Sequence, residues 1–251
     1  MWKARIHERG RAAGGETNGK LSLSVPGETA MKNKTKNSYR IILLVALSLL
    51  FSCATSEKEL KASKEAEAYL SRGYEYATQG KQDQAIADYT RALELNPKYL
   101  DAYANRGVAY AAIGQYDQAI SDYTKALEIN PKSGEVYNNR GNAYLNKGQY
   151  DNAISDYNKA LEITPRSAAT YNNRGHAYLN RGQFDQAISD FSKAVEILPR
   201  FALAYANRAR AYYLKGNYDK SWEDVTKTQE LGLPIPQEFI DELRKASGRQ
   251  Q

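Results

Sequence analysis

The chain is poor in the residue types that build catalytic and metal sites. Its 251 residues include one cysteine and two histidines, and only His176 lies beyond residue 53. A single cysteine excludes an internal disulfide framework, and the sequence has no glycine-rich phosphate loop and no metal-ligand spacing. We therefore expect no catalytic residues, no metal site and no cofactor, and we do not expect an enzyme.

Long hydrophobic runs are also missing. The longest apolar stretch, residues 41–51, is too short for a membrane-spanning helix, which needs about 20 residues. It follows residues 31–40, which carry four basic residues and no acidic one. A basic segment before a short apolar run is typical of an export signal. We expect residues 31–52 to be a signal peptide that starts at Met31, and residues 1–30 to be an untranslated upstream extension or a disordered one.

Cys53 comes directly after this signal. Residues 50–53, Leu-Phe-Ser-Cys, resemble the bacterial lipobox, with Phe51 where a small residue is usual. The resemblance implies lipidation of Cys53, a lipid anchor in the membrane and, since Ala54 is not the aspartate that retains such lipoproteins at the inner membrane, an outer-membrane location facing the periplasm. Residues 53–65 are polar and alternate in charge, so we expect a polar tether, which would reach about 40 Å if extended.

The basic surplus of the chain lies in its first fifth. The formal net charge is +6, but residues 1–52 hold nine Lys/Arg and three Asp/Glu, which leaves 26 of each in the remainder. The segment expected to mature is therefore neutral overall. We expect no nucleic-acid partner.

One motif recurs through the rest of the chain at a fixed spacing of 34 residues. Tyr103, Tyr137 and Tyr171 each begin the pattern Tyr-x2-Arg-Gly-x2-Tyr, followed at constant offsets by a glycine, an Ala-Ile pair, an aromatic residue and a proline. One copy precedes these at Tyr69, and a looser one follows at Tyr205. A fixed period of this length indicates stacked supersecondary units. The five units are residues 66–99, 100–133, 134–167, 168–201 and 202–235.

Each unit carries two amphipathic helical stripes. In the second unit they are Tyr103–Ala111 and Ala119–Leu127, with apolar residues at spacings of three and four. Gly114 stands where the first helix needs a left-handed stop, Asp117 is expected to cap the second helix, and Pro131 to end it. One hairpin of this size cannot bury its apolar face alone, so the units are expected to stack into a solenoid.

The pattern Tyr-x2-Arg-Gly-x2-Tyr, Ala-x3-aromatic and Pro resembles the tetratricopeptide repeat. The resemblance covers residues 66–235. It implies an all-α, right-handed superhelical solenoid of five helical hairpins, with a concave face lined by the first helix of each hairpin. It also implies binding of a protein or peptide client rather than catalysis. Residues 236–251 have an apolar stripe and a charged outer face, which predicts a C-terminal capping helix.

Every unit has an arginine where the family usually has an apolar residue. Every unit also has an aspartate sixteen residues later, on the helix that should pack beside it. A buried, unpaired guanidinium would be costly. We therefore predict five ion pairs: Arg72–Asp88, Arg106–Asp122, Arg140–Asp156, Arg174–Asp190 and Arg208–Asp224.

Asparagine recurs at one position of the first helix in four consecutive units. Helix propensity does not explain it, because asparagine is a mediocre helix former. Either these amides bond between neighbouring units, or they form a ladder that binds the backbone of an extended peptide. On the second interpretation, the peptide-binding groove contains Asn105, Asn139, Asn142, Asn173, His176, Asn207 and Arg210. The simpler interpretation of His176 is a solvated side chain.

These features favour a lipid-anchored adaptor of the bacterial envelope that binds a peptide segment or a partner subunit. Similar lipoproteins act in envelope or pilus assembly, an association that rests on family resemblance alone. The alternative is a structural module that self-associates through its end faces and has no client. A secreted enzyme subunit would need a catalytic residue set that the sequence lacks.

Overall fold

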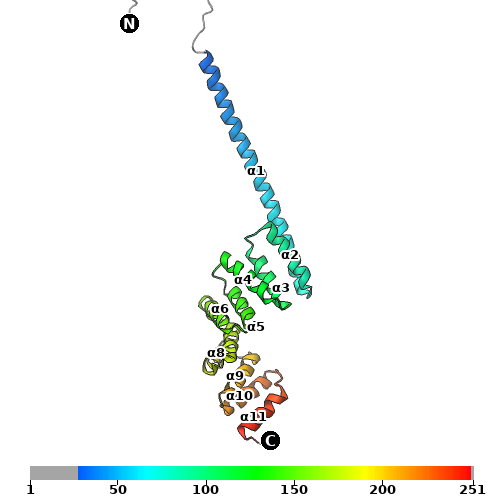
Figure 1. Cartoon of the computed structure of the whole chain (residues 1–251), viewed down its shortest axis with the longest axis vertical. Helices are drawn as coiled ribbons and strands as arrows, with labels where there is room; N and C mark the ends of the chain where they lie inside the picture. Colours follow the sequence, from blue (N-terminus) through cyan, green and yellow to red (C-terminus); the bar gives the residue numbers. More distant parts are fainter. Residues whose placement is uncertain (1–27, 250–251) are drawn as a thin grey trace, which may run out of the picture. The chain divides into compact units, whose positions relative to one another are not determined.

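The computed structural model describes residues 28–249, and for part of residues 28–55 it describes the backbone alone. The chain divides into two compact units, residues 1–57 and 58–251, which are considered separately. All regular elements within residues 28–249 are α-helices (Figure 1): α1 (Glu28–Thr78), α2 (Gln82–Leu95), α3 (Leu100–Ala112), α4 (Tyr116–Ile129), α5 (Gly134–Asn146), α6 (Tyr150–Ile163), α7 (Ala168–Asn180), α8 (Phe184–Ile197), α9 (Ala202–Leu214), α10 (Tyr218–Glu230) and α11 (Gln237–Ser247).

In the N-terminal unit, the described residues belong to α1. Among all described residues, no helix combines the length and the apolar character that a membrane span requires. The expected upstream extension falls mostly on residues 1–27, which lie outside the described part of the chain. The side chain of Cys53 lies outside it as well, so its lipidation stays a prediction.

The segment of residues 53–65, where the sequence predicts a polar tether, is helical and continues α1. The reason is its composition, because alanine, leucine, glutamate and lysine dominate residues 57–68 and are all strong helix formers.

The second unit contains five helical hairpins that follow one another in sequence order. The first pairs the end of α1 with α2, where Leu70 and Tyr76 pack against Ala85 and Tyr89. The others pair α3 with α4, α5 with α6, α7 with α8, and α9 with α10. Each second helix also packs against the first helix of the next hairpin, so the hairpins stack in one row. The predicted all-α solenoid of five hairpins with a C-terminal helix is confirmed.

The two helices of a hairpin occupy different sides of the stack. Each of α3, α5 and α7 contacts the first helix of the next hairpin, and no pair of neighbouring second helices among the described residues packs as closely. The side on which neighbouring helices approach more closely is the inner side of a curved stack. The first helices therefore line the concave side, as predicted.

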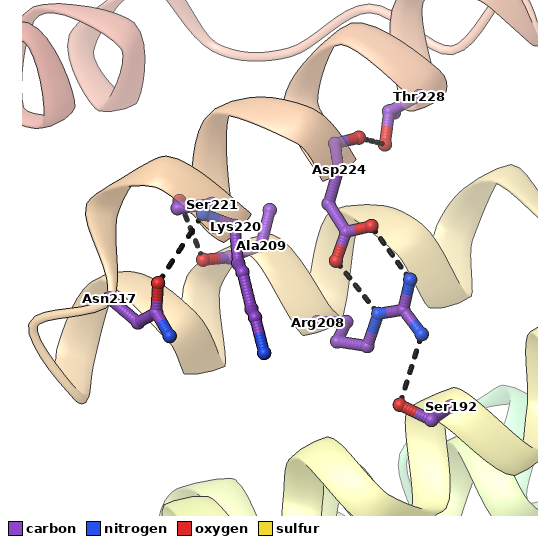
Figure 2. A network of polar contacts seen from close by, with 8 residues as sticks. All are labelled: Ser192, Arg208, Ala209, Asn217, Lys220, Ser221, Asp224 and Thr228. Carbon is purple, nitrogen blue, oxygen red and sulfur yellow. Dashed lines mark hydrogen bonds and ion pairs between the residues drawn. The ribbon is translucent and has the colours of Figure 1, made fainter.

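The hairpins close where a glycine of the first helix meets an aromatic ring of the second. A β-carbon at Gly141 would lie 2.7 Å from Cε1 of Tyr157, and the same contact recurs in the first, second and fourth hairpins. The fifth hairpin replaces both partners, since Ala209 faces the smaller Val225 in one core cluster. The deviation of this hairpin from the repeat is therefore a matched exchange of volume. Its Ser221 hydroxyl, which replaces an alanine, donates to the Ala209 carbonyl at 2.8 Å (Figure 2).

The turn between the two helices confirms one prediction and corrects another. Gly114 has a φ of 76°, the left-handed conformation expected of a helix stop. Asp117, however, does not cap the second helix, because α4 begins at Tyr116 and its N-cap residue is Gln115. Asp117 is the second residue of α4, and its carboxylate pairs with Lys147 of the next hairpin. The predicted helix end at Asn130 and Pro131 is confirmed.

The same ion pair recurs along this edge of the stack. Equivalent pairs join Arg181 to Asp151 at 2.6 Å and Lys215 to Asp185. Arg249, which follows α11, continues the series with Asp219 at 2.8 Å. The apolar stripe of α11 covers the last hairpin, where Leu243 and Phe239 pack with Val225. The C-terminal helix therefore follows the last hairpin much as a further repeat would.

Candidate functional site

Four first helices leave one stripe of side chains uncovered on the concave side. We call this surface the groove face and define it by four equivalent positions of α3, α5, α7 and α9. All of these side chains are exposed or half-buried: Asp101, Asn105, Val108, Ala112, Glu135, Asn139, Asn142, Asn146, Ala169, Asn173, His176, Asn180, Leu203, Asn207, Arg210 and Leu214. The structure thus brings every predicted groove residue onto one surface.

Behind the groove face lies the predicted series of arginine–aspartate pairs. Arg140 donates to both carboxylate oxygens of Asp156, from Nε at 2.7 Å and from Nη2 at 2.8 Å. Its Nη1 donates to Thr124 of the preceding hairpin at 3.0 Å, and its guanidinium lies 5.6 Å from the centroid of the Tyr137 ring. The hydrogen bonds that Arg140 donates to the Asp156 carboxylate raise the pKa of Arg140 further. This arginine joins two hairpins and is not available to a ligand.

The pairing is confirmed in all five hairpins. The partner of the third hydrogen bond of the arginine differs from hairpin to hairpin. Figure 2 shows the copy in the fifth hairpin, where Arg208 binds Asp224 and donates to Ser192. In the fourth hairpin the third partner is Asn158, at 2.6 Å. Arg72 forms the same pair with Asp88, but no hairpin precedes it among the described residues, and its side chain is 53% exposed.

The asparagine ladder divides into two kinds of residue. Asn173 donates to Asn138 of the preceding hairpin at 3.2 Å, and Asn207 donates to Asn172 at 2.9 Å. For these two residues the inter-repeat interpretation holds. Asn139 accepts only a local bond of 3.4 Å from Asn138, and Asn105 has no side-chain partner among the described residues.

The sequence contains the signal that separates the two kinds. An inter-hairpin bond needs an asparagine one position before the ladder residue of the preceding unit. Only the third and fourth units have one, at Asn138 and Asn172, where the second has Ala104. Asn139 therefore has no asparagine in the preceding hairpin to which its NH2 group could donate, and this difference can be read from the sequence.

Three further groove residues have distinct surroundings. His176 is exposed at the surface, yet the protein around it desolvates the ring enough to lower its pKa. Arg210 is exposed and has no ion-pair partner among the described residues. Asn142 accepts a hydrogen bond from the Tyr157 hydroxyl at 2.7 Å, a contact that the sequence analysis missed. Within the described residues, no cluster of His, Cys, Asp and Glu is placed to hold a metal ion.

A small cavity opens on the groove face between α3 and α5. Its volume is about 230 Å³. The lining includes two predicted groove residues, Asn139 and Asn142, together with Val108, Ala111, Tyr116, Tyr123, Ala143 and Asn146. The remaining predicted residues lie on the same surface outside this cavity.

Family models match the repeated part of the chain. The model described as TPR repeat matches residues 73–114 and 141–182. Two models described as tetratricopeptide repeat match residues 100–133 and 168–201, and residues 122–155. No curated protein sequence matches the chain.

Solved structures resemble the fold over most of its length. A MamA protein is 26% identical, with a TM-score of 0.62 over 75% of this chain and 97% of its own. PilF from Pseudomonas aeruginosa is 22% identical, with a TM-score of 0.66 over 75% and 86%. YrrB, described as a TPR protein with an unusual peptide-binding site, is 25% identical, with a TM-score of 0.58 over 70% and 91%. The family matches cover residues 73–201 without a gap, and the solved structures share the fold. The chain therefore belongs to the tetratricopeptide-repeat family.

Proposed function

We propose that this protein is an adaptor that binds an extended segment of a partner protein along its groove face. One contrast carries the proposal. The arginines behind the face have all their aspartate bonds made, whereas Asn105, His176 and Arg210 on the face have no side-chain partner among the described residues. Free amides offer a donor and an acceptor to a peptide backbone, and a free guanidinium suits a carboxylate.

The comparisons support a binding role. Tetratricopeptide-repeat proteins are generally non-catalytic adaptors, and YrrB is described as having a peptide-binding site. At 25% identity, YrrB supports peptide binding here as a proposal. PilF, at 22% identity, supports the fold alone. A role of this protein in envelope or pilus assembly is supported only by its resemblance to lipoproteins of this kind.

We further propose that the adaptor is held at the bacterial outer membrane, facing the periplasm, by a lipid on Cys53. The support is in the sequence: a basic segment, an apolar run and the lipobox-like residues 50–53. Acyl chains contribute about 0.8 kcal/mol per buried CH2, so more than one chain is needed for stable anchoring. Labelled palmitate should enter the wild-type protein and be absent from Cys53→Ala. A wild-type protein that takes up no label would contradict the anchor.

The self-associating module is the less favoured function because both ends of the stack are polar or covered. The second to fifth hairpins each bury an alanine against the preceding hairpin, at Ala109, Ala143, Ala177 and Ala211. The first hairpin has an exposed glutamate, Glu75, at this position. Helix α11 covers the other end. End-to-end stacking of copies would therefore bury a carboxylate at one end, at a cost in free energy.

A photo-crosslinker placed at single positions tests the adaptor function in cells. We would introduce it at Asn105 on the groove face and, as a matched control, at Ser155, which is exposed on the second helix α6. The proposal expects one partner segment, identified by mass spectrometry, that crosslinks from Asn105 and not from Ser155. Crosslinks to a second copy of this chain alone would favour the self-associating module.

A further inference from the structure

The cavity between α3 and α5 lies where one side chain is smaller than its counterparts in the next two hairpins. Ala111 lines it, and the equivalent positions of the next two hairpins are Leu145 and Leu179. Leu145 packs against the core cluster of its hairpin, and Leu179 is buried. A leucine at position 111 would place its extra carbon atoms in the space that is open here. The first hairpin also has an alanine at this position, Ala77.

A polar group with no partner faces this space. In the third hairpin the hydroxyl of Tyr157 donates to Asn142 at 2.7 Å. Tyr123 is the equivalent residue of the second hairpin, but the position equivalent to Asn142 is Val108, which has no acceptor. Tyr123 is 1% exposed, lines the cavity, and has no hydrogen-bond partner among the described residues. Among the described residues, the buried side-chain polar atom without a partner is Oε1 of Gln183, so the Tyr123 hydroxyl is open to water on the cavity side. A ligand that bonds to this hydroxyl takes the place of that water.

Each asparagine amide around the cavity has one of its polar groups hydrogen-bonded within the protein, and its other polar group is available to a ligand. The Oδ1 atoms of Asn142 and Asn139 each accept a bond, from Tyr157 and Asn138, so their amide hydrogens remain free. The amide of Asn146 donates to the backbone carbonyl of Asn142, so its oxygen remains free. The cavity therefore offers both donors and an acceptor.

The surroundings are unfavourable for an anion. Burial raises the pKa of Tyr123, and the nearby carboxylates of Asp122 and Glu135 raise it further, because they oppose negative charge at this point. Asp122 is neutralised by Arg106, with which it forms two hydrogen bonds. Glu135 has no ion-pair partner among the described residues. A carboxylate that entered the cavity would meet the same opposition.

We propose that this cavity is a specificity pocket that receives one uncharged side chain with a hydrogen-bonding tip, such as glutamine or tyrosine, from the bound segment. The inference rests on the proposed peptide-binding function. Pockets for drug-sized ligands begin at about 300 Å³, so a volume of about 230 Å³ suits one side chain and not a free small molecule. Val108 and the Tyr116 ring supply apolar contacts, and the Tyr123 hydroxyl and the three amides bond to the tip.

Selection from a displayed library of random 12-residue peptides tests the pocket. Wild type and Ala111→Leu, which fills the cavity with the residue of the next two hairpins, would be screened in parallel after melting curves show that both fold. Wild-type selections should share a position enriched in uncharged, hydrogen-bonding residues, and Ala111→Leu should lose this preference. For the best peptide we expect Ala111→Leu to weaken binding at least 10-fold, and to leave unchanged the binding of the same peptide with alanine at that position.

A second variant keeps the test decisive if Ala111→Leu does not fold. Tyr123→Phe removes only the hydroxyl and should weaken the selected peptide about fivefold. Tyr89→Phe, the equivalent change in the first hairpin, lies outside the cavity and serves as its control. An unchanged preference in Ala111→Leu or Tyr123→Phe, or enrichment of aspartate and glutamate, would overturn the pocket alone. A wild type that selects no peptide would overturn the proposed function as well.

Discussion

Arg140 and Asp156 form two parallel hydrogen bonds, at 2.7 and 2.8 Å, from the two helices of one hairpin. Both side chains are largely buried, with 17% and 7% of their surfaces exposed. Removing one partner leaves the other charge buried and uncompensated, so Arg140→Met and Asp156→Asn should each lower the free energy of unfolding by about 3 kcal/mol. The double variant should lose clearly less than the sum of the single losses.

Urea denaturation of the four proteins in this cycle provides the measurement. Thr124→Ala is a useful companion, because it leaves both bonds to Asp156 in place. It removes the third bond of Arg140 and the bond from the Thr124 hydroxyl to the Ile120 carbonyl, and should cost about 1 kcal/mol for each lost bond. Strictly additive losses would show that the two charges do not interact in solution.

The fourth hairpin predicts a pH dependence for the same kind of pair. Burial raises the pKa of Asp190, and the hydrogen bonds from Arg174 act in the opposite direction. In Arg174→Met this opposition is lost, so the folded state binds a proton that the unfolded state releases at about pH 4. Stability then falls as pH rises through the raised pKa. The destabilisation by Arg174→Met should therefore be smaller at pH 4.5, roughly, than at about pH 7.5.

Unfolding curves across this pH range check the prediction, with Arg174→Met/Asp190→Asn as the control. The control carries no ionisable group at position 190, so the difference between the two variants isolates the proton. If the two variants show the same pH profile, Asp190 is not the group that titrates.

The contact between Gly141 and Tyr157 predicts a compensating pair of substitutions. Gly141→Ala would place a β-carbon 2.7 Å from the ring. Overpacking of this kind costs about 1–3 kcal/mol, which exceeds the gain of about 1 kcal/mol from helix propensity. Tyr157→Val alone should leave a cavity and lower the melting temperature. The double variant reproduces Ala209 and Val225 of the fifth hairpin and should lose less than the sum of the single losses.

Thermal unfolding followed by circular dichroism would measure the three variants. Gly148→Ala is an instructive contrast, because its strain comes from a φ of 73° rather than from the ring. Tyr157→Val should therefore not rescue Gly148→Ala. Rescue of both glycine variants would point to a general effect of the valine rather than relief of the contact.

The parts of this structure that repeat could be predicted from the sequence, whereas most of the parts that differ between repeats were missed. Arg140 and Asp156 recur every 34 residues, so their pairing was visible as a pattern. Asp117 was misassigned as a helix cap because it lies two residues beyond the actual N-cap, Gln115, where its carboxylate pairs with Lys147 instead. The cavity at Ala111 is a missing volume, which appears only when the neighbouring side chains are in place.

The two kinds of ladder asparagine make the sharpest prediction about function. Asn173 and Asn207 bond to the preceding hairpin, so their joint change to alanine should lower the melting temperature, at about 1 kcal/mol for each lost bond. Asn105 and Asn139 make no inter-hairpin bond, and their joint change to alanine should leave the melting temperature nearly unchanged.

For binding, the expected order of the two double variants is reversed. Each of Asn105 and Asn139 is expected to contribute a hydrogen bond of about 1 kcal/mol to the backbone of the bound segment. Losing one such bond weakens binding about fivefold and losing both about 30-fold, so the double variant should fall between these values. Fluorescence anisotropy with a synthetic peptide of the crosslinked segment would measure this, with circular dichroism to show that the helices are retained. Binding as tight as wild type would remove the groove face as the site, because these are the ladder amides that make no bond between hairpins. Loss of stability in Asn105→Ala/Asn139→Ala would instead mean that these two amides also hold the stack together.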